Sequence, residues 1–111
     1  MANDSSILRQ LASVIEDRRR NRPPNSYTTK LLDRGLDAIG AKVVEEAAEA
    51  VEAAGAPDDC RHDALTHEAA DLIYHLLVLL AHGGVTLDDV EAELARRFGI
   101  SGLEEKASRR K

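Results

Sequence analysis

Acidic residues recur at helical spacing in two separate stretches of the chain. In the first stretch Glu46 and Glu49 are three residues apart, with Glu45 directly before them. In the second stretch Glu68 and Asp71 repeat the three-residue spacing. Because residues three or four apart share one face of a helix, each pair presents both of its carboxylates on one side. Two such helices packed side by side would bring four carboxylates together.

Carboxylates packed this closely repel one another, and the usual remedies are protonation or a divalent cation. An all-oxygen donor set suits Mg²⁺ or Mn²⁺, whereas a helical di-iron site would need Glu-x-x-His pairs, which the sequence does not contain. We therefore interpret Glu46, Glu49, Glu68 and Asp71 as metal ligands. The alternative is that they are ordinary solvated acids, since a single Glu-x-x-Glu pair is common in helices.

The composition of the chain indicates what must position these acids. Its 111 residues fit one domain, 1–111, and its 43% hydrophobic and 3% aromatic content favours helices packed through aliphatic side chains. We predict an all-α fold of four to five helices.

The net charge of -5 argues against a nucleic-acid partner, which would need a basic surface. The single cysteine, Cys60, excludes an intramolecular disulfide and a cysteine-based zinc site, and it fits a reducing compartment.

Hydrophobic spacing and helix-breaking residues predict where the helices lie. The predicted helices are 6–20, 35–54, 58–82 and 86–99. Pro23 and Pro24 end the first helix, and 26–34 is predicted as a connector with room for one helical turn. Thr86 is the predicted N-cap of the last helix. The side chains predicted to face inward from that helix are Val90, Leu94 and Phe98.

An apolar stretch near the middle of the chain bears on assembly and location. The run 76–80 is apolar on every side and needs burial all round, so we predict a homodimer in which helices of two chains form one bundle. The run 72–81 falls short of the about 20 residues that cross a bilayer, so we predict no membrane span. Residues 1–6 lack a secretory signal pattern, and we expect a cytoplasmic protein with a basic, mobile tail at 100–111.

Four stretches of the sequence resemble a known family. The acidic pairs at 46–49 and 68–71 resemble the motif of the MazG-like all-α nucleotide pyrophosphohydrolase superfamily. More closely, the chain resembles the phosphoribosyl-ATP pyrophosphohydrolases of histidine biosynthesis, in the stretches SYT (26–28), KVVEEAAE (42–49), EAADLIYHLLVLL (68–80) and SGLEEK (101–106). The resemblance implies hydrolysis of phosphoribosyl-ATP to phosphoribosyl-AMP and pyrophosphate, the second step of the pathway, by a homodimer that uses Mg²⁺.

In such a hydrolysis water attacks a phosphorus of the triphosphate, and the charge that develops on the phosphate oxygens must be stabilised. The metal ligands would do this through the bound ion, and Glu45 would orient or deprotonate the water. The predicted catalytic residues are therefore Glu45, Glu46 and Glu49. The alternative for Glu45 is a surface acid paired with a neighbouring base.

Cationic side chains are needed because four carboxylates alone would repel a triphosphate. Lys42 shares the acidic stripe of its helix and is a candidate for phosphate contact, the alternative being an ion pair within the helix. Lys30 and Arg109 are further candidates, although charged helix ends and tails are usually solvated. His75, one turn beyond Asp71, would bind phosphate or move a proton. Its alternative is a hydrogen-bonded histidine of the core or of a dimer contact.

Two other functions fit parts of this pattern. A sister enzyme of the same superfamily would have the same metal site but would cleave dNTPs or damaged nucleoside triphosphates. A non-catalytic helical dimerisation module would have acids that merely face solvent. Substrate preference distinguishes the first of these from a phosphoribosyl-ATP pyrophosphohydrolase, and binding of a divalent ion distinguishes the second.

Overall fold

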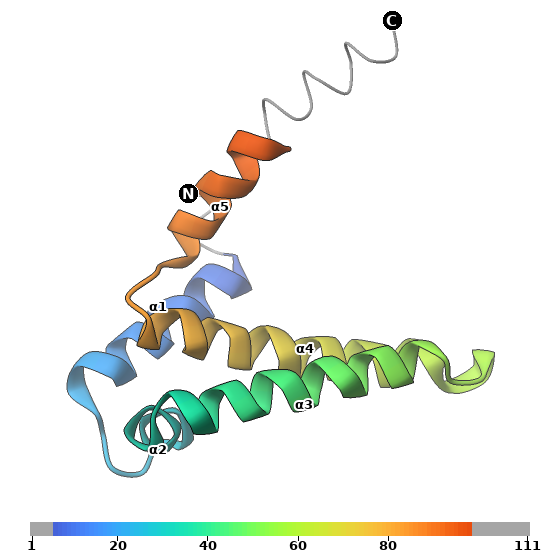
Figure 1. Cartoon of the computed structure of the whole chain (residues 1–111), viewed down its shortest axis with the longest axis horizontal. Helices are drawn as coiled ribbons and strands as arrows, with labels where there is room; N and C mark the ends of the chain where they lie inside the picture. The colour runs from blue at the N-terminus through green and yellow to red at the C-terminus, as the bar shows by residue number, and fades with distance from the viewer. Residues whose placement is uncertain (1–5, 99–111) are drawn as a thin grey trace, which may run out of the picture.

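The computed structural model describes residues 6–98, and these residues form five α-helices and no strand. The helices are α1 (Ile7–Asn21), α2 (Tyr27–Arg34), α3 (Leu36–Ala54), α4 (Asp58–His82) and α5 (Leu87–Arg97). Figure 1 shows α3 and α4 side by side as a long antiparallel hairpin, with α1 and α2 packed near one end of it. The predicted all-α class is confirmed. The tail at 100–111 lies outside the described residues.

The prediction of a connector at 26–34 is wrong, because this segment is the helix α2. Ser26 starts the helix, since its side chain accepts a hydrogen bond from the backbone N–H of Thr29. Thr28, Leu31 and Leu32 then point inward and are buried. An eight-residue helix is marginal by itself. Its apolar face must therefore be held by packing against the other helices, which the local sequence does not show.

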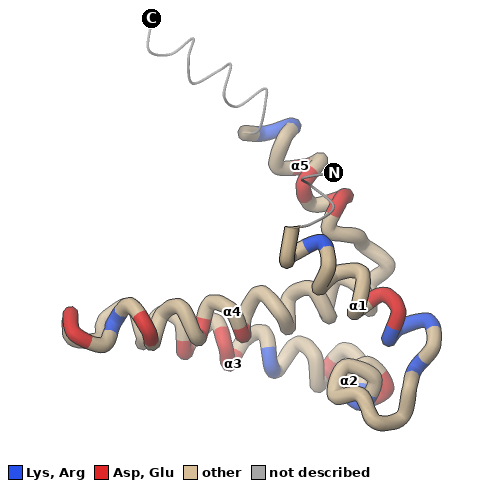
Figure 2. The backbone as a smooth tube through the Cα atoms, turned by 180° about the vertical axis from the view of Figure 1, so that it is seen from behind, with Lys and Arg blue, Asp and Glu red and all other residues tan. Residues whose placement is uncertain are grey.

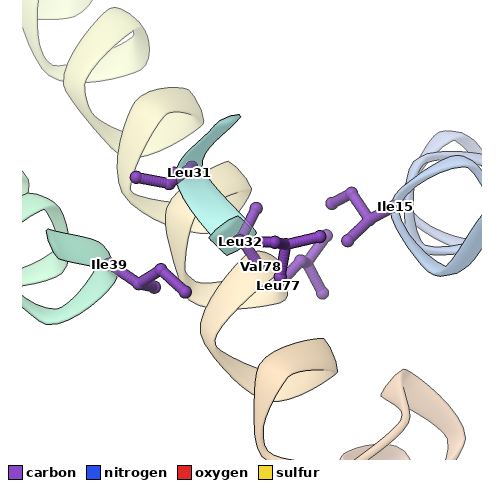
Figure 3. Packing of buried hydrophobic residues seen from close by; sticks show 6 residues of the cluster. All are labelled: Ile15, Leu31, Leu32, Ile39, Leu77 and Val78. Atoms are coloured by element: carbon purple, nitrogen blue, oxygen red, sulfur yellow. The ribbon is translucent and has the colours of Figure 1, made fainter. Parts of the chain in front are cut away.

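The hydrophobic core lies where α1, α2, α3 and α4 meet at one end of the hairpin. Figure 3 shows the side chains that form it, which are Ile15, Leu31, Leu32, Ile39, Leu77 and Val78. Ile39 and Val78 are fully buried on facing helices, and Ile15 of α1 is 1% exposed. Burial of an aliphatic side chain of this size stabilises a fold by about 1.5–3 kcal/mol, so this cluster anchors α1 and α2 to the hairpin.

Gly35 joins α2 to α3 with no further loop residue. It is at once the C-cap of α2, where its N–H donates to the carbonyls of Leu31 and Leu32, and the N-cap of α3. Its backbone angles, φ 90° and ψ -169°, lie in a region that essentially only glycine adopts. A residue with a side chain would therefore strain the junction that sets the angle between α2 and α3.

The helix α5 is capped well but packs little. Thr86 and Asp89 form a reciprocal capping box, so the predicted N-cap is confirmed. Arg9 of α1 forms ion pairs of 2.5 Å with Asp88 and Glu91. Of the three side chains predicted to face inward, Val90 is partly buried. The prediction is wrong for Leu94 and Phe98, which are 49% and 65% exposed on a helix that projects away from the hairpin (Figure 1).

By length and composition, α4 could cross a membrane. Its most apolar 18-residue window has a mean hydropathy of 1.3, which is apolar enough for a membrane span. The run 72–81 alone is too short for one. Only 22% of that window is buried in the described structure. The core helix of a soluble protein passes the same test, so hydropathy alone does not distinguish the two.

Candidate metal centre

Three of the four predicted metal ligands meet between α3 and α4. Carboxylate oxygens of Glu46, Glu68 and Asp71 lie within 4.8 Å of one another. Glu46 comes from the middle of α3, and the other two are one turn apart on α4. The antiparallel pairing of the two helices brings these positions level, and Figure 2 shows acidic segments of both helices next to each other along the hairpin.

Two carboxylate oxygens of this cluster are buried without a hydrogen-bond partner. They are Oε1 of Glu46 and Oε1 of Glu68, and the Glu46 residue as a whole is only 6% exposed. An unpaired buried carboxylate is costly unless a cation or a donor compensates it. Hard oxygen donors that converge in this way are what a divalent cation such as Mg²⁺ binds. The residues present therefore fit the metal ion that the motif implies.

Glu49, the fourth predicted ligand, lies beside Glu68. Burial between the helices raises the pKa of the Glu68 carboxyl, and the charge of Glu49 and a hydrogen bond with it raise the pKa further. The carboxylate of Asp71 acts in the same direction more weakly. The exposed His67 lowers the pKa, and its Nε2 lies 3.3 Å from Oδ2 of Asp71. Glu49 and Asp71 thus both act on the Glu68 carboxyl, while Glu49 is not among the three side chains whose oxygens converge.

Lys42 and Glu45 lie on the same stretch of α3. The Lys42 ammonium is 3.6 Å from Oε1 of Glu45. The pKa of Lys42 is raised, first by the charge of Glu45 and then by Tyr27 and Glu46, so its ammonium stays protonated. The side chains are 36% and 53% exposed, which leaves both accessible to a ligand. The geometry contains the ion pair within the helix that we gave as the alternative, and a phosphate contact of Lys42 stays a prediction.

His75 is buried directly behind the carboxylates. Its Nδ1 lies 2.9 Å from the backbone carbonyl oxygen of Asp71 and 3.4 Å from Oε1 of Glu46. Its Nε2 lies 3.0 Å from the hydroxyl of Tyr27 on α2. Both ring nitrogens therefore have partners, as in the hydrogen-bonded alternative. A direct contact with substrate stays a prediction.

Tyr27 belongs to the family-like stretch 26–28, and its contact with His75 is the feature of this site that no motif indicated. Tyr27 lies on α2 and is 51% exposed. Its ring stacks on the ring of Tyr74, with the two ring centroids 6.2 Å apart. The Tyr74 hydroxyl is hydrogen-bonded to Thr28, and burial raises the pKa of Tyr74. The N-cap pattern at Ser26 could have indicated the helix that places Tyr27 here.

Two further residues were predicted to contact substrate, Lys30 and Arg109. Lys30 is exposed on α2. Arg109 lies outside the described residues. Within 6–98, Glu46, Glu68 and Asp71 are the group of metal-ligating side chains that comes this close together.

Known proteins provide independent information on this chain. The sequence pattern of the family described as phosphoribosyl-ATP pyrophosphohydrolase matches residues 8–98. A protein of Rhodopirellula baltica named phosphoribosyl-ATP pyrophosphatase is 53% identical over 102 residues, covering 92% of this chain and 85% of the relative. A protein of Paramagnetospirillum magneticum with the same name is 50% identical and covers 100% of this chain and 99% of the relative. A third, of Hydrogenovibrio crunogenus, is 46% identical over 100% of this chain and 97% of its own length.

Proposed function

The chain belongs to the phosphoribosyl-ATP pyrophosphohydrolase family, and from this premise we propose that it hydrolyses its substrate at the carboxylate cluster of α3 and α4 with the help of Mg²⁺. The activity of the family, and of this chain, converts phosphoribosyl-ATP to phosphoribosyl-AMP and pyrophosphate in histidine biosynthesis. The observation that supports the location is that one buried oxygen each of Glu46 and Glu68, beside Asp71, accepts no hydrogen bond.

The residues that would hold the ion are Glu46, Glu49, Glu68 and Asp71. When bound, Mg²⁺ would neutralise charge on the phosphate oxygens and make an attacking water more acidic. Glu45 precedes Glu46 on α3 and is half-exposed, so it would accept a proton from a water molecule on the open side. Lys42, held protonated by Glu45, can meet a phosphate oxygen at the same edge.

The test is pyrophosphate release by the purified chain from phosphoribosyl-ATP and, in parallel, from dATP. We expect release from phosphoribosyl-ATP in Mg²⁺ and none after addition of EDTA. A preference for dATP would instead support a sister enzyme of the superfamily. No release from either substrate, together with no binding of a divalent ion, would support the non-catalytic dimerisation module.

A matched pair of variants on α4 tests the site itself. Asp71→Asn should lower kcat by roughly 100-fold or more, because it removes a charge that acts on the reacting phosphate through the ion. Asp63→Asn makes the same chemical change on the same helix at a side chain that is 96% exposed, and it should leave kcat unchanged. Equal activities of the two variants would mean that the cluster is not the active site.

We further propose that the chain works as a homodimer built on the α3–α4 hairpin. Ala69, Ile73, Leu76 and Leu80 follow one another at the spacing of a coiled-coil seam. Ile73 and Leu76 are 40% and 41% exposed in the single chain. A second copy that packs on this seam would bury them, and the twofold symmetry of the commonest oligomers fits such a pairing.

A cytoplasmic location is also proposed. The polar face of α4, with Glu68, Asp71 and His75, packs against α3 in the described structure, which suits a helix of a water-soluble enzyme better than one surrounded by lipid. Recovery of the chain in the soluble fraction without detergent would support this location, and recovery only in the membrane fraction would contradict it.

A further inference from the structure

The imidazole of His75 stands between the carboxylate cluster and α2. It is 6% exposed, and its two nitrogens face opposite partners, with Glu46 and the Asp71 carbonyl on one side and the Tyr27 hydroxyl on the other. A buried histidine with both nitrogens engaged in this way has a fixed ring orientation. The fixed ring can therefore hold the side chains of Glu46 and Tyr27 in place.

The partners of His75 determine where its ring proton sits. A backbone carbonyl oxygen only accepts hydrogen bonds, so Nδ1, at 2.9 Å from the Asp71 oxygen, must be the donor. In the neutral ring Nε2 is then an acceptor, and the Tyr27 hydroxyl donates its proton to it at 3.0 Å. This arrangement leaves the lone pairs of the Tyr27 oxygen free to accept from another donor.

On the side of the cluster, His75 restrains the Glu46 side chain, but Oε1 of Glu46 remains available to bind a metal ion. Nδ1 is 3.4 Å from Oε1 of Glu46, too far for a full hydrogen bond while its proton points at the Asp71 carbonyl. The partial positive charge of the N–H still attracts this oxygen and favours one rotamer of a side chain that is 7% exposed. Donors of this kind behind a ligand orient it and tune its affinity for a metal ion.

On the side of α2, Tyr27 is 51% exposed, so its oxygen is accessible to a ligand. The Tyr27 ring is fixed by stacking on Tyr74 at 6.2 Å and by an edge contact with His75 at 6.0 Å. The Tyr27 oxygen can then accept a hydrogen bond from a ribose hydroxyl, while the Lys42 ammonium can donate to a phosphate oxygen.

We propose that His75 is a positioning residue that fixes Glu46 as a metal ligand through Nδ1 and the Tyr27 hydroxyl as a substrate-binding group through Nε2. This role rests on the proposed function, since it places the metal ion and the phosphates at the same cluster. It differs from a direct contact between His75 and substrate, because the histidine acts only through its two neighbours.

Two isosteric variants distinguish the role of Nδ1 of His75 from the role of Nε2. Asparagine places an amide N–H near the position of Nδ1, and glutamine places its amide near the position of Nε2. His75→Asn should therefore retain the effect on Glu46 and lose the contact with Tyr27. His75→Gln should retain the contact with Tyr27 and lose the effect on Glu46.

The first measurement is the dissociation constant of Mn²⁺, taken from the electron paramagnetic resonance signal of the free ion without substrate. His75→Gln should weaken Mn²⁺ binding about tenfold, as is usual for loss of a donor behind a metal ligand. His75→Asn and Tyr27→Phe should bind Mn²⁺ like the wild-type chain. Unchanged Mn²⁺ affinity in His75→Gln would overturn the proposed effect on Glu46.

The second measurement is the KM for phosphoribosyl-ATP. Tyr27→Phe and His75→Asn should each raise KM roughly three- to tenfold, the value of one hydrogen bond, and the double variant should be no worse than either. The control is Tyr74→Phe, which keeps the ring next to His75 and removes a hydroxyl bonded to Thr28, and its KM should not change. Additive effects in the double variant would overturn the link between His75 and Tyr27.

The wild-type chain provides a check that needs no variant of the buried histidine. The ¹⁵N shifts of the His75 ring should show the proton on Nδ1, and Tyr27→Phe should shift Nε2 alone. A proton on Nε2 would contradict the inference whether or not the His75 variants fold. If the wild-type chain binds Mn²⁺ and hydrolyses phosphoribosyl-ATP while these results fail, the inference is wrong and the proposed function stands. If it does neither, both are wrong.

Discussion

At the scale of single residues, the acidic pairs were the part of the site that sequence spacing could indicate. Glu46 and Glu49 on one helix and Glu68 and Asp71 on another are set by the helical repeat alone. Their meeting depends on only one further condition, that the two helices pair. The contact between His75 and Tyr27 depends on how α2 crosses α4, and 48 positions separate the two residues, so no local pattern could have shown it.

Neutralising Glu68 should raise the stability of the protein without metal and should abolish its stabilisation by Mg²⁺. In Glu68→Gln the repulsion by Glu49 and the burial of a charge are removed, so the melting temperature in EDTA should rise. The wild-type chain should gain roughly 2.7 kcal/mol when the free Mg²⁺ concentration is 100 times the dissociation constant, and the variant should gain almost none. Differential scanning fluorimetry in EDTA and in Mg²⁺ measures both effects.

The control for this experiment is Glu52→Gln, which removes the same charge from an exposed position of α3. Its stabilisation by Mg²⁺ should equal that of the wild-type chain. Full stabilisation of Glu68→Gln by Mg²⁺ would contradict the assignment of Glu68 as a ligand.

At the scale of elements, periodicity predicted four of the five helices in the described residues and missed α2. The long helices α3 and α4 begin and end close to the predicted residues, because long amphipathic patterns and breakers define them. The helix α2 was missed, since its eight residues form a helix only when Leu31 and Leu32 are buried by other elements. The face of α5 was misassigned, since a pattern shows which side chains are apolar but not what is available to cover them.

The junction at Gly35 offers a test of how α2 is placed. Gly35→Ala should lower the free energy of unfolding by about 1–3 kcal/mol, because an alanine at φ 90° is strained although nothing lies within 4 Å of the added Cβ. Gly40→Ala is the matched control, since this residue lies inside α3 with open space around its Cβ, and it should stabilise by up to about 1 kcal/mol. Urea unfolding measures both, and equal stability of Gly35→Ala and wild type would contradict the strain at the junction.

The C-terminal turns of α1 predict a dependence of stability on pH. The Arg19 and Arg20 guanidinium groups, with Arg19 the stronger, lower the pKa of Glu16 from 4.5 to about 2. A lowered pKa stabilises the fold above about 4.5, and this contribution is lost as the pH falls toward about 2. Because the Glu16 side chain is 37% exposed, Glu16→Gln should cost only roughly 0.5–1 kcal/mol at pH 7.

The difference between Glu16→Gln and wild type should shrink between pH 4.5 and about 2, measured as the urea midpoint in a pH series. The exposed Asp63→Asn controls for the loss of one negative charge. A difference that stays constant over this range would show that the ion pairs of Glu16 do not contribute.

At the scale of the whole molecule, the exposed seam of α4 predicts the oligomeric state. Leu76→Glu would place a charge where the second copy is proposed to pack, so the chain should sediment as a monomer at concentrations at which the wild type is a dimer. Asn25→Glu, in the exposed turn before α2, is the control and should remain dimeric. Analytical ultracentrifugation measures this, and a dimer of Leu76→Glu would exclude this seam as the interface.

The position of the core at one end of the hairpin has a consequence for its other end. Between residues 47 and 74 the one buried residue of the single chain is Ala53, so within one chain the far halves of α3 and α4 have little but each other to hold them. Such weakly packed regions open locally more often than the rest of a fold. A cation bound between Glu46, Glu68 and Asp71 would join the two helices at the boundary of this region. Amide hydrogen exchange in the hairpin tip should therefore be fast without metal and should slow when Mg²⁺ binds, while exchange around Ile39 and Val78 hardly changes.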